Sequence, residues 1–474
     1  MKKKSDDNSR GVLRNISDIA RKVAGSSVRK KSARRQQSVR PEAVSLLPKD
    51  YVLDSDANDA FSAIKKNYPF VFVTGKAGTG KSTFIQYVVE SFSGGAVVVA
   101  PTGIAALNVR GQTIHSFFRF PPRLFDSSEI KDRRDNLVNN LKLIIIDEIS
   151  MVRADLMDHI DEALQKWTRK RKPFGGIQVM VVGDLFQLPP VVAGEQERQF
   201  IDSNYGTPWF FSAKAFESVD VYAIELKHVY RQADPYFIEK LNRIRTNSDH
   251  EDAVTELNQL CQRDNYAGES ILILTATNRH AEGYNQRNLS KIPQPSKTYV
   301  GVIEGKFGLT EERLPAPMEL VLKPSAQVMV TKNVGGVVNG TIGNVQSLDD
   351  HSVTIRTLED NRQVTLVKEK WERYTYKWNP SAGKISTQVV GTYEQVPLML
   401  GWAITIHKCQ GLTMDSVFID LGSGAFAPGQ TYVALSRCRT IDGISFAKPI
   451  SMRDVMADQD VLEFTEHLFG DAAT

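Results

Sequence analysis

The chain has 474 residues, with 59 Lys or Arg against 55 Asp or Glu, so its formal net charge is only +4. Residues 1–49 hold 14 Lys or Arg against 4 Asp or Glu, a net +10, and residues 50–474 carry a net −6, so any nucleic-acid surface on the body must be local. No apolar run approaches the ~18 residues of a membrane span, no secretory signal is evident, and three distant cysteines exclude a disulfide framework and a Cys-based zinc site, which favours an intracellular protein.

The segment 1–49 is rich in Ser, Lys and Arg and poor in aromatic residues, a composition typical of a disordered tail. Within it, Gly11–Val23 could form a short amphipathic helix. A basic tail suits nucleic-acid binding, a nuclear signal or a transit peptide, although Asp6, Asp7 and Asp18 weaken the last hypothesis. A solvated tail without a specific role is at least as good an interpretation.

From about residue 50, short β-branched apolar runs alternate with longer amphipathic stretches. This pattern predicts buried parallel strands in an α/β fold. The predicted strands are Phe70–Val73, Ala96–Val99, Leu143–Ile146, Val179–Val182, Ile271–Leu274 and Val417–Asp420. The predicted helices include Ser82–Phe92, Ala154–Trp167 and Pro235–Arg245.

Between residues 326 and 395 turn signals such as Asn339-Gly340 interrupt alternating strands, among them Ser352–Thr357 and Gln363–Val367. Asn-Gly between apolar runs is a strong hairpin signal, so we expect a small antiparallel β-barrel inserted in a second α/β domain. The expected organisation is a tail at 1–49, a first α/β domain at 50–214, a second at 215–325 and 396–474, and the barrel at 326–395.

The strongest motif is Gly75-Lys-Ala-Gly-Thr-Gly-Lys-Ser82, which fits the phosphate-loop pattern and lies between a predicted strand and a predicted helix. Its glycines let backbone N–H groups converge on phosphate oxygens, and the helix N-terminus adds a positive dipole end. Lys81 would neutralise the β- and γ-phosphates and Ser82 would bind Mg²⁺, so ATP and Mg²⁺ are the expected cofactors. The expected nucleotide-binding residues of the loop are Gly75, Ala77, Gly78, Thr79, Gly80, Lys81, Ser82 and Thr83.

Acidic and amide side chains follow two later strands. Asp147 and Glu148 end the strand at 143–146, where the carboxyl ends of parallel strands border the nucleotide crevice. Asp147 suits a Mg²⁺ contact and Glu148 suits polarising the attacking water. Gln187, in the segment Gly183–Pro190, suits sensing the γ-phosphate, although a turn stiffened by two prolines is an alternative.

Two arginines, Arg231 and Arg437, lie far from the phosphate loop in the sequence. Either could reach the γ-phosphate from a second domain, a role typically worth ~10³–10⁵ in rate. Without further context a surface ion pair is the better explanation for each, because most arginines have that role.

Several polar and aromatic sets suit nucleic acid, because small hydroxyls and backbone N–H groups hold phosphates and Phe or His can stack on bases. They comprise Pro101, Thr102, His115, Phe117, Thr331, Lys332, Asn333, Thr405, His407 and Lys408. The basic cluster Lys166–Lys172 is explained equally well by cations that complement a helix C-terminus.

In this order the motifs resemble those of the PIF-type (petite integration frequency) DNA helicases, relatives of RecD within superfamily 1. The resemblance covers roughly residues 50–474 and includes Ala100–Ala106, Asp147–Met151 and Pro173–Ile177. It implies a P-loop NTPase with two RecA-like domains, ATP between them, single-stranded DNA across their upper surface and a β-barrel that closes over the DNA. The implied function is a monomeric 5′ to 3′ DNA helicase acting on single-stranded and forked DNA in replication, repair, recombination or telomere maintenance.

Carried over residue by residue, the resemblance implies that Lys81 and Ser82 hold the phosphates and Mg²⁺. It implies that Asp147 and Glu148 serve the metal and the attacking water. Gln187 would couple the γ-phosphate to DNA, and Arg231 and Arg437 would be arginine fingers. The loop at Phe117–Pro122 would help to separate strands, and Thr102, His115, Thr405, His407 and Lys408 would face DNA.

The chain departs from the family pattern in one respect. The family usually has a Gln before the phosphate loop that reads adenine, and the segment 53–61 has none; Asn58 is the candidate substitute. A single-stranded-DNA-binding protein or the replisome is a candidate partner, in the cytoplasm of a prokaryote or virus-infected cell, or in a eukaryotic nucleus or mitochondrion. An ATP-gated clamp without processive unwinding and a small-molecule P-loop enzyme are the alternatives.

Overall fold

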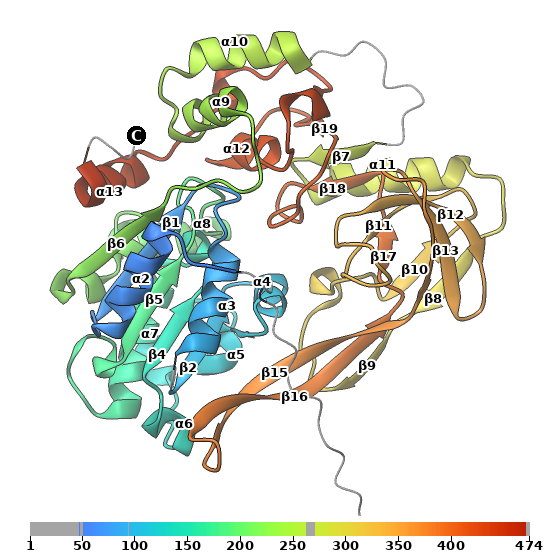
Figure 1. Ribbon diagram of the computed structural model, residues 1–474. Helices are drawn as coiled ribbons and strands as arrows, with labels where there is room; N and C mark the ends of the chain where they lie inside the picture. Colours follow the sequence, from blue (N-terminus) through green and yellow to red (C-terminus); the bar gives the residue numbers. More distant parts are fainter. Residues whose placement is uncertain (1–46, 48–50, 93, 262–270, 471–474) are drawn as a thin grey trace, which may run out of the picture. The chain divides into compact units, whose positions relative to one another are not determined.

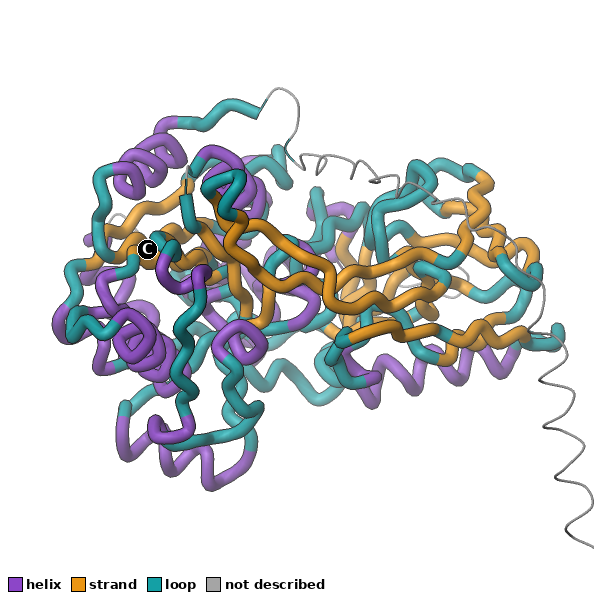
Figure 2. Tube along the Cα trace, turned by 90° about the horizontal axis from the view of Figure 1, so that it is seen from below, coloured by secondary structure: helices purple, strands orange, loops and turns teal. Residues whose placement is uncertain are grey.

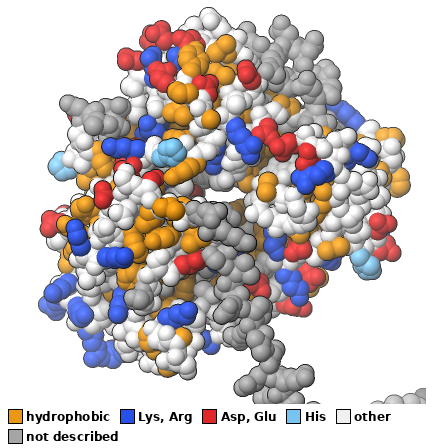
Figure 3. Space-filling model, in the orientation of Figure 1, with side chains coloured by type: hydrophobic (Ala, Val, Ile, Leu, Met, Phe, Trp, Pro, Cys, Tyr) orange, Lys and Arg blue, Asp and Glu red, His pale blue; other side chains and the backbone are white. Residues whose placement is uncertain are grey.

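The structure is a computed structural model that describes residue 47 and residues 51–92, 94–261 and 271–470 (Figure 1). The disorder expected for the basic tail and the helix expected at Gly11–Val23 therefore lie outside the described residues. None of the described helices is long and apolar enough to span a membrane. On the face shown in Figure 3, basic and acidic side chains are interspersed, in keeping with a near-neutral body.

The first sheet has six parallel strands in the order β3-β2-β4-β5-β1-β6. All four strands predicted in this region are confirmed. The strands are β1 Phe70–Gly75, β2 Ala96–Ala100, β3 Gln112–Thr113, β4 Leu143–Ile146, β5 Gln178–Val182 and β6 Val221–Leu226. The sheet thus extends beyond residue 214, where we expected the first domain to end, because the edge strand β6, which is half-buried over most of its length, adds to it beside β1.

Helices cover both faces of this sheet, since alternate side chains of each strand point to opposite faces. Helices α2 and α3 pack on the face that carries Val71 and Val73, and α5 and α7 pack on the face that carries Phe72. The helices of this region are α2 Ser55–Lys65, α3 Lys81–Ser91, α4 Gly103–Asn108, α5 Ile114–Phe118, α6 Asn136–Asn139, α7 Ala154–Thr168 and α8 Gly194–Asn204.

The last helix, α13 Gln459–Phe469, also packs on the first sheet, although we expected residues 396–474 to belong to the second domain. Its Phe464 ring stacks on Phe211 with 4.1 Å between centroids. An amphipathic pattern predicts that a helix has a buried face but not which core receives it, which explains this difference.

The second sheet has four parallel strands in the order β18-β7-β19-β20. They are β7 Leu272–Thr275, β18 Ala403–Thr405, β19 Val417–Asp420 and β20 Ile444–Phe446. The helices are α9 Pro235–Thr246, α10 His250–Cys261, α11 Asn278–Lys291 and α12 Gln430–Leu435. Short 3₁₀ helices in the described ranges are Ser127–Glu129, Ile149–Met151, Pro173–Gly176, Phe210–Ser212, Lys214–Ser218, Glu311–Arg313, Ile441–Gly443 and Met452–Asp454.

The antiparallel insertion is present, but its strands form separate sheets (Figure 2). Five strands in the order β14-β13-β12-β11-β17, together with the pair β8–β10, enclose one apolar core. The remaining strands form a three-stranded sheet in the order β15-β16-β9. Their bounds are β8 Lys297–Val300, β9 Val302–Gly305, β10 Glu319–Leu322, β11 Gln327–Val330, β12 Ile342–Leu348, β13 Ser352–Thr357, β14 Gln363–Val367, β15 Glu369–Asn379, β16 Lys384–Gln395 and β17 Leu398–Leu400.

The long β15–β16 hairpin contacts the first sheet rather than closing the barrel that we expected at 326–395. The buried Tyr376 hydroxyl accepts a hydrogen bond from Val98 N at 2.9 Å and donates one to Val98 O at 3.0 Å. Arg373 donates to Ser116 Oγ at 2.7 Å. These contacts satisfy polar groups of β2 that β3 leaves unpaired, which gives the hairpin a physical reason to leave the five-stranded sheet.

Candidate active site and nucleic-acid interface

The phosphate loop connects β1 to α3, as its pattern predicts. Gly78 and Gly80 have φ of 86° and 80°, in the left-handed region that favours glycine. A Cβ on Gly78 would lie 2.5 Å from the Cβ of Arg231, so this position also needs glycine for space. No side chain caps the N-terminus of α3. The loop therefore offers its backbone N–H groups to a ligand.

A cavity of about 620 Å³ lies over this loop and brings together most of the predicted nucleotide-binding residues. It is lined by Ala77, Gly78, Thr79, Gly80, Lys81, Ser82, Thr83, Glu148, Gln187, Tyr230, Arg231, Gly411, Thr413, Arg437 and Arg439. Two predicted residues, Gly75 and Asp147, lie behind this lining, at the ends of β1 and β4. Groups from both parallel sheets thus converge on one cavity.

Lys81 folds back onto its own loop, with Nζ donating to Gly75 O at 2.7 Å and to Lys76 O at 3.0 Å. Burial lowers the pKa of Lys81, and the carboxylates of Asp184 and Glu148 oppose that effect. Because carbonyl oxygens are replaceable acceptors, a phosphate entering the cavity would offer the ammonium a charged partner instead.

Asp147, which is buried, and Glu148, which is half-buried and lines the cavity, form an acidic pair beside Lys81. Burial raises the pKa of both carboxyl groups, and for Asp147 the charge of Glu148 adds to the effect. Adjacent carboxylates with little solvent around them are stabilised by a cation, so this pair and the exposed Ser82 hydroxyl fit a Mg²⁺ ion. No cluster of three or more acidic, His or Cys side chains forms a complete metal site within the described ranges, so phosphate oxygens would have to complete the coordination.

The two predicted arginine fingers lie together at the cavity. Arg231 donates from Nε to Thr413 Oγ1 at 2.9 Å and from Nη1 to Ser436 O at 3.2 Å. Arg437 is 1% exposed and donates from Nε to Val433 O at 2.8 Å. Burial, and next the charge of Arg437, lower the pKa of Arg231 to about 10.

Neither arginine has a carboxylate within ion-pair distance in the part of the chain that the structure describes. The charge of Arg437 acts on Glu148 across the cavity, but no carboxylate pairs directly with either guanidinium among the described residues, so the cavity is suited to an anion. The surface ion pairs that we considered the better explanation for Arg231 and Arg437 are therefore wrong.

A buried network that sequence reasoning missed connects the two sheets. Asp184 Oδ1 accepts from Arg245 Nη2 at 3.1 Å, and both side chains are almost fully buried. Asp184 Oδ2 accepts from Gln187 Nε2 at 3.3 Å and from the Tyr432 hydroxyl at 3.2 Å, which itself accepts from Ala77 N at 3.0 Å. Arg245 lies in the last turn of an amphipathic helix, where a solvent-facing cation is the default expectation, so the local sequence gave no signal for its burial.

The predicted DNA-facing residues divide into two groups. The first group lies half-buried or exposed at the carboxyl ends of strands and comprises Pro101, Thr102, His115, His407 and Lys408. The Thr102 hydroxyl caps α4 by accepting from Ala105 N at 3.2 Å. Burial lowers the pKa of both His115 and His407, which favours neutral rings. These residues are therefore suited to polar or stacking contacts, and Lys408 supplies a cation.

The prediction for Phe117 is wrong. Its ring is 2% exposed and lies 6.0 Å from Trp167 and 6.1 Å from Tyr376, between centroids. Phe118 and Phe120, in the loop expected to separate strands, are also buried in this core. These three aromatic residues, close together in the sequence, pack in the apolar core and do not form a base-stacking surface.

The other predicted DNA contacts differ in their exposure and in the partners that they already have. Thr405 is 4% exposed, so its side chain does not face solvent. Lys332 pairs with Glu369 at 3.1 Å. Asn333 accepts from Asn339 N at 2.7 Å within its turn, and the hydroxyl of Thr331 is buried. Asn333 is exposed, and the expected DNA contact at 331–333 stays a prediction.

Asn58 is exposed on α2 and does not line the nucleotide cavity, so it is not placed to read adenine. Tyr230 is at the rim instead, with 59% of its surface exposed and its hydroxyl donating to Asp54 at 3.2 Å. Its ring is a stacking surface that the Tyr-Arg-Gln motif contained but that sequence reasoning did not assign.

Comparison with known proteins agrees with this geometry. A model of the PIF1-like helicase family matches residues 53–254. The chain is 33% identical over 393 residues to the ATP-dependent DNA helicase PIF1 of Mus musculus, covering 79% of this chain but only 57% of that protein. It is 31% identical over 414 residues to the ATP-dependent DNA helicase Pif1 of Bdellovibrio bacteriovorus, covering 84% and 89% of the two chains.

A solved structure shares the fold. The Pif1 helicase from Bacteroides in complex with ADP-AlF3 and single-stranded DNA is 36% identical, with a TM-score of 0.64 over 90% of this chain and 99% of that one. The ordered motifs, the cavity shared by two parallel sheets and these matches have one common explanation. The chain belongs to the PIF1-like helicase family.

Proposed function

We propose that the chain is an ATP-dependent DNA helicase that moves 5′ to 3′ on single-stranded DNA and unwinds duplex or structured DNA. The main support for this proposal is the cavity in which the phosphate loop meets Arg231, from the segment between β6 and α9, and Arg437, which follows α12 beside the second sheet. A nucleotide there is contacted by both sheets, so hydrolysis and release change the contacts between them. A small-molecule P-loop enzyme has no need for that coupling.

Several side chains in and beside the cavity have specific roles in this proposal. Lys81 exchanges its carbonyl acceptors for phosphate oxygens, and Glu148 orients the attacking water. Arg231 and Arg437 stabilise charge on the γ-phosphate, and the Tyr230 ring covers the base. Ser82 and Asp147 would hold Mg²⁺, which supplies neutralisation of phosphate charge when bound.

The Asp184 network couples these groups. It joins Gln187, which faces the γ-phosphate position, to Tyr432 on α12 and to Ala77 in the phosphate loop. A change in the phosphate contacts therefore reaches α12 of the second sheet directly. The two-domain division, with each RecA-like sheet as one body, is part of this proposal.

DNA would cross the carboxyl edges of both sheets, contacting Thr102 and His115 on the first and His407 and Lys408 on the second. Contacts to phosphates carry no sequence information, so binding is expected to be salt-sensitive and largely independent of sequence. The family relatives are named as DNA helicases, and a Bacteroides relative holds single-stranded DNA, which supports DNA as the partner. A monomeric state stays a prediction, since two coordinating Pif1 helicases are described on forked DNA for a relative.

The test is ATP hydrolysis with and without single-stranded DNA, followed by strand displacement on duplexes with a 5′ tail or a 3′ tail. We expect DNA to stimulate hydrolysis and displacement to require the 5′ tail. Hydrolysis that ignores DNA contradicts the motor, and displacement only from 3′ tails contradicts the direction. Stimulated hydrolysis without displacement would favour the ATP-gated clamp. Glu148→Gln is the matched control, because it keeps the side-chain shape but removes the carboxylate.

A further inference from the structure

The Tyr230 ring, at the rim of the nucleotide cavity, is held against the phosphate loop. Tyr230 N donates to Gly78 O at 2.9 Å, and a Cβ built on Gly80 would lie 3.6 Å from the ring. The His228 ring meets it edge-on, with 4.3 Å between centroids. These contacts fix the ring relative to the loop that would hold the phosphates, so the base of a bound nucleotide has a preformed surface on which to stack.

The carboxylates at the start of α2 are already engaged within the protein. Asp54 accepts from the Tyr230 hydroxyl at 3.2 Å with one oxygen, and with the other it caps α2 by accepting from Ala57 N at 2.8 Å. Asp56 accepts from Lys227 N at 3.1 Å. A base that used either carboxylate would compete with these bonds, so neither is well suited to recognise an amino group.

The polar side chains that line the cavity do not favour one base. Among the described residues of the lining, Glu148 carries the carboxylate and Gln187 the amide, and both have the roles at the γ-phosphate assigned above. Arg439 pairs with Asp415 at 3.3 Å. Hydroxyls such as that of Thr83 can donate or accept, so they do not distinguish an amino group from a carbonyl.

The stacking surface is open to solvent, since 59% of Tyr230 is exposed. A base that lies on it keeps its polar edge in water, which pairs with amino and carbonyl groups alike. Strong selectivity, of about 10⁴-fold or more, arises where a wrong substrate leaves buried polar groups of a site unpaired. Stacking carries no such penalty because every base has a π-face, and it contributes about 10- to 100-fold to affinity.

We propose that this site hydrolyses nucleoside triphosphates with little regard to the base, so that GTP, CTP and UTP can replace ATP. The inference rests on the proposed function and widens its substrate class. In each case the oxygen of water bonds to the γ-phosphorus and the bond to the oxygen that bridges to the β-phosphate breaks. The products are a nucleoside diphosphate, inorganic phosphate and a proton. Tyr230 is the residue through which the base adds to affinity.

The test measures phosphate release by the full chain with each of the four nucleotides, at a saturating concentration of oligo(dT). We expect kcat/KM values that differ by less than about 100-fold, with purines ahead of pyrimidines because they stack more strongly. A preference for ATP of about 100-fold or more over any other nucleotide would overturn the inference. If DNA stimulates hydrolysis of ATP alone, the proposed function stands and the inference fails. If DNA stimulates hydrolysis of no nucleotide, the proposed function fails as well.

Variants of Tyr230 test the role of the ring. Tyr230→Ala should raise KM about 10- to 100-fold, by a similar factor for all four nucleotides, whereas Tyr230→Phe should keep most of the affinity because it keeps the ring. Inorganic tripolyphosphate has no base, so it should inhibit the unaltered chain and Tyr230→Ala equally. A loss confined to ATP, or a loss of tripolyphosphate binding as large as that of nucleotide binding, would overturn the assignment.

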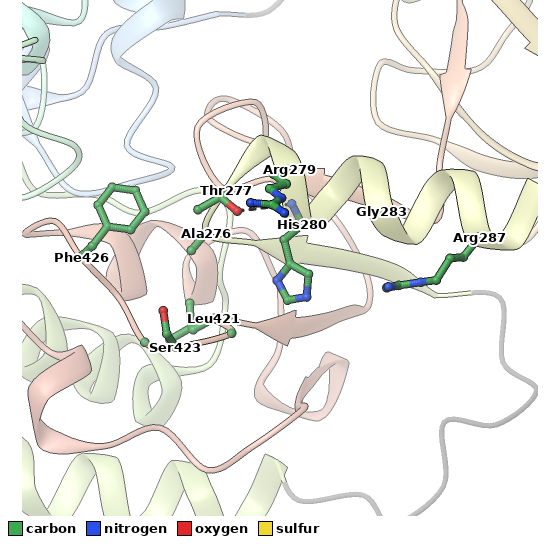
Figure 4. Close-up of a pocket in the computed structure, with 11 residues that line it drawn as sticks. Ala276, Thr277, Arg279, His280, Gly283, Arg287, Leu421, Ser423 and Phe426 are labelled. Carbon is green, nitrogen blue, oxygen red and sulfur yellow. Dashed lines mark hydrogen bonds between the residues drawn. The ribbon is translucent and has the colours of Figure 1, made fainter.

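The matched control is Phe426→Ala. Phe426 is 61% exposed, close to the value for Tyr230, but it lines a separate cavity of about 400 Å³ that shares no lining residue with the nucleotide cavity (Figure 4). With oligo(dT) saturating, this variant should keep the KM of every nucleotide. An equal rise of KM in both alanine variants would overturn the inference, because the loss of an exposed ring would then act without contact with the base.

Discussion

Replacing Arg245 by Met removes one partner of a buried ion pair and leaves the other charged. The side chains of Arg245 and Asp184 are 3% and 0% exposed, and two guanidinium nitrogens lie 3.1 and 3.3 Å from one carboxylate oxygen. Breaking such a pair costs about 3–5 kcal/mol, because the remaining charge stays buried without its counterion. The Met side chain keeps the apolar contact with Phe186, over which the guanidinium lies at 4.2 Å.

The loss of folding stability in Arg245→Met depends on pH, and the structure gives the direction of that dependence. Burial would raise the pKa of Asp184, but the charges of Arg245 and Lys81 outweigh it and hold the pKa below its ordinary value. Without Arg245 the folded-state pKa rises, so protonation relieves the buried charge as the pH falls. The stability deficit of Arg245→Met should therefore be largest at neutral pH and shrink as the pH is lowered.

Urea unfolding followed by circular dichroism at several pH values measures this loss. Adding Asp184→Asn to Arg245→Met should recover part of the loss, since it removes the unpaired charge. Arg243→Met on the same helix breaks only the exposed pair with Glu239, so it should cost about 1 kcal/mol or less. A cost for Arg245→Met no larger than for Arg243→Met, or a double variant whose cost is the sum of its singles, would refute the reasoning.

Three further outcomes are expected. Lys81→Ala should abolish ATP hydrolysis, measured as phosphate release, with unchanged circular dichroism; retained hydrolysis would contradict the assigned site. Tyr376→Phe should cost about 1–3 kcal/mol, because Val98 loses a buried hydrogen-bond partner, and should speed hydrogen exchange at the Val98 amide; unchanged exchange would mean that the hairpin contact does not form in solution. Phe117→Ala should cost about 3–5 kcal/mol in unfolding free energy; a selective loss of DNA affinity with unchanged stability would show that the ring faces DNA after all.

Much of the local structure follows from the sequence. The phosphate loop needs only a strand, a glycine-rich turn and a helix that are contiguous in the chain, so its pattern predicted both its position and its chemistry. The runs at 70–73, 143–146 and 179–182 predicted buried parallel strands for a similar reason, since a strand covered on both faces is apolar at every position.

The assembly of the site depends on contacts between residues that are far apart in the chain. Arg231 bonds to Ser436, and Tyr376 bonds to Val98, across separations of 205 and 278 residues. Local apolar periodicity shows that a side chain is buried but not what it is buried against. For that reason sequence reasoning expected Phe117 at a DNA surface and had no role for Arg245.

The charge distribution along the chain follows from the sequence, and the fold adds which charged side chains lie together. A body with a net −6 required any nucleic-acid surface to be local, and the sequence alone established that constraint. Only the tertiary structure showed where cations without an ion pair gather among the described residues, at Arg231 with Arg437. The physical reason is that a net charge is a sum over the chain, whereas an unpaired cation is a property of which side chains fold against one another.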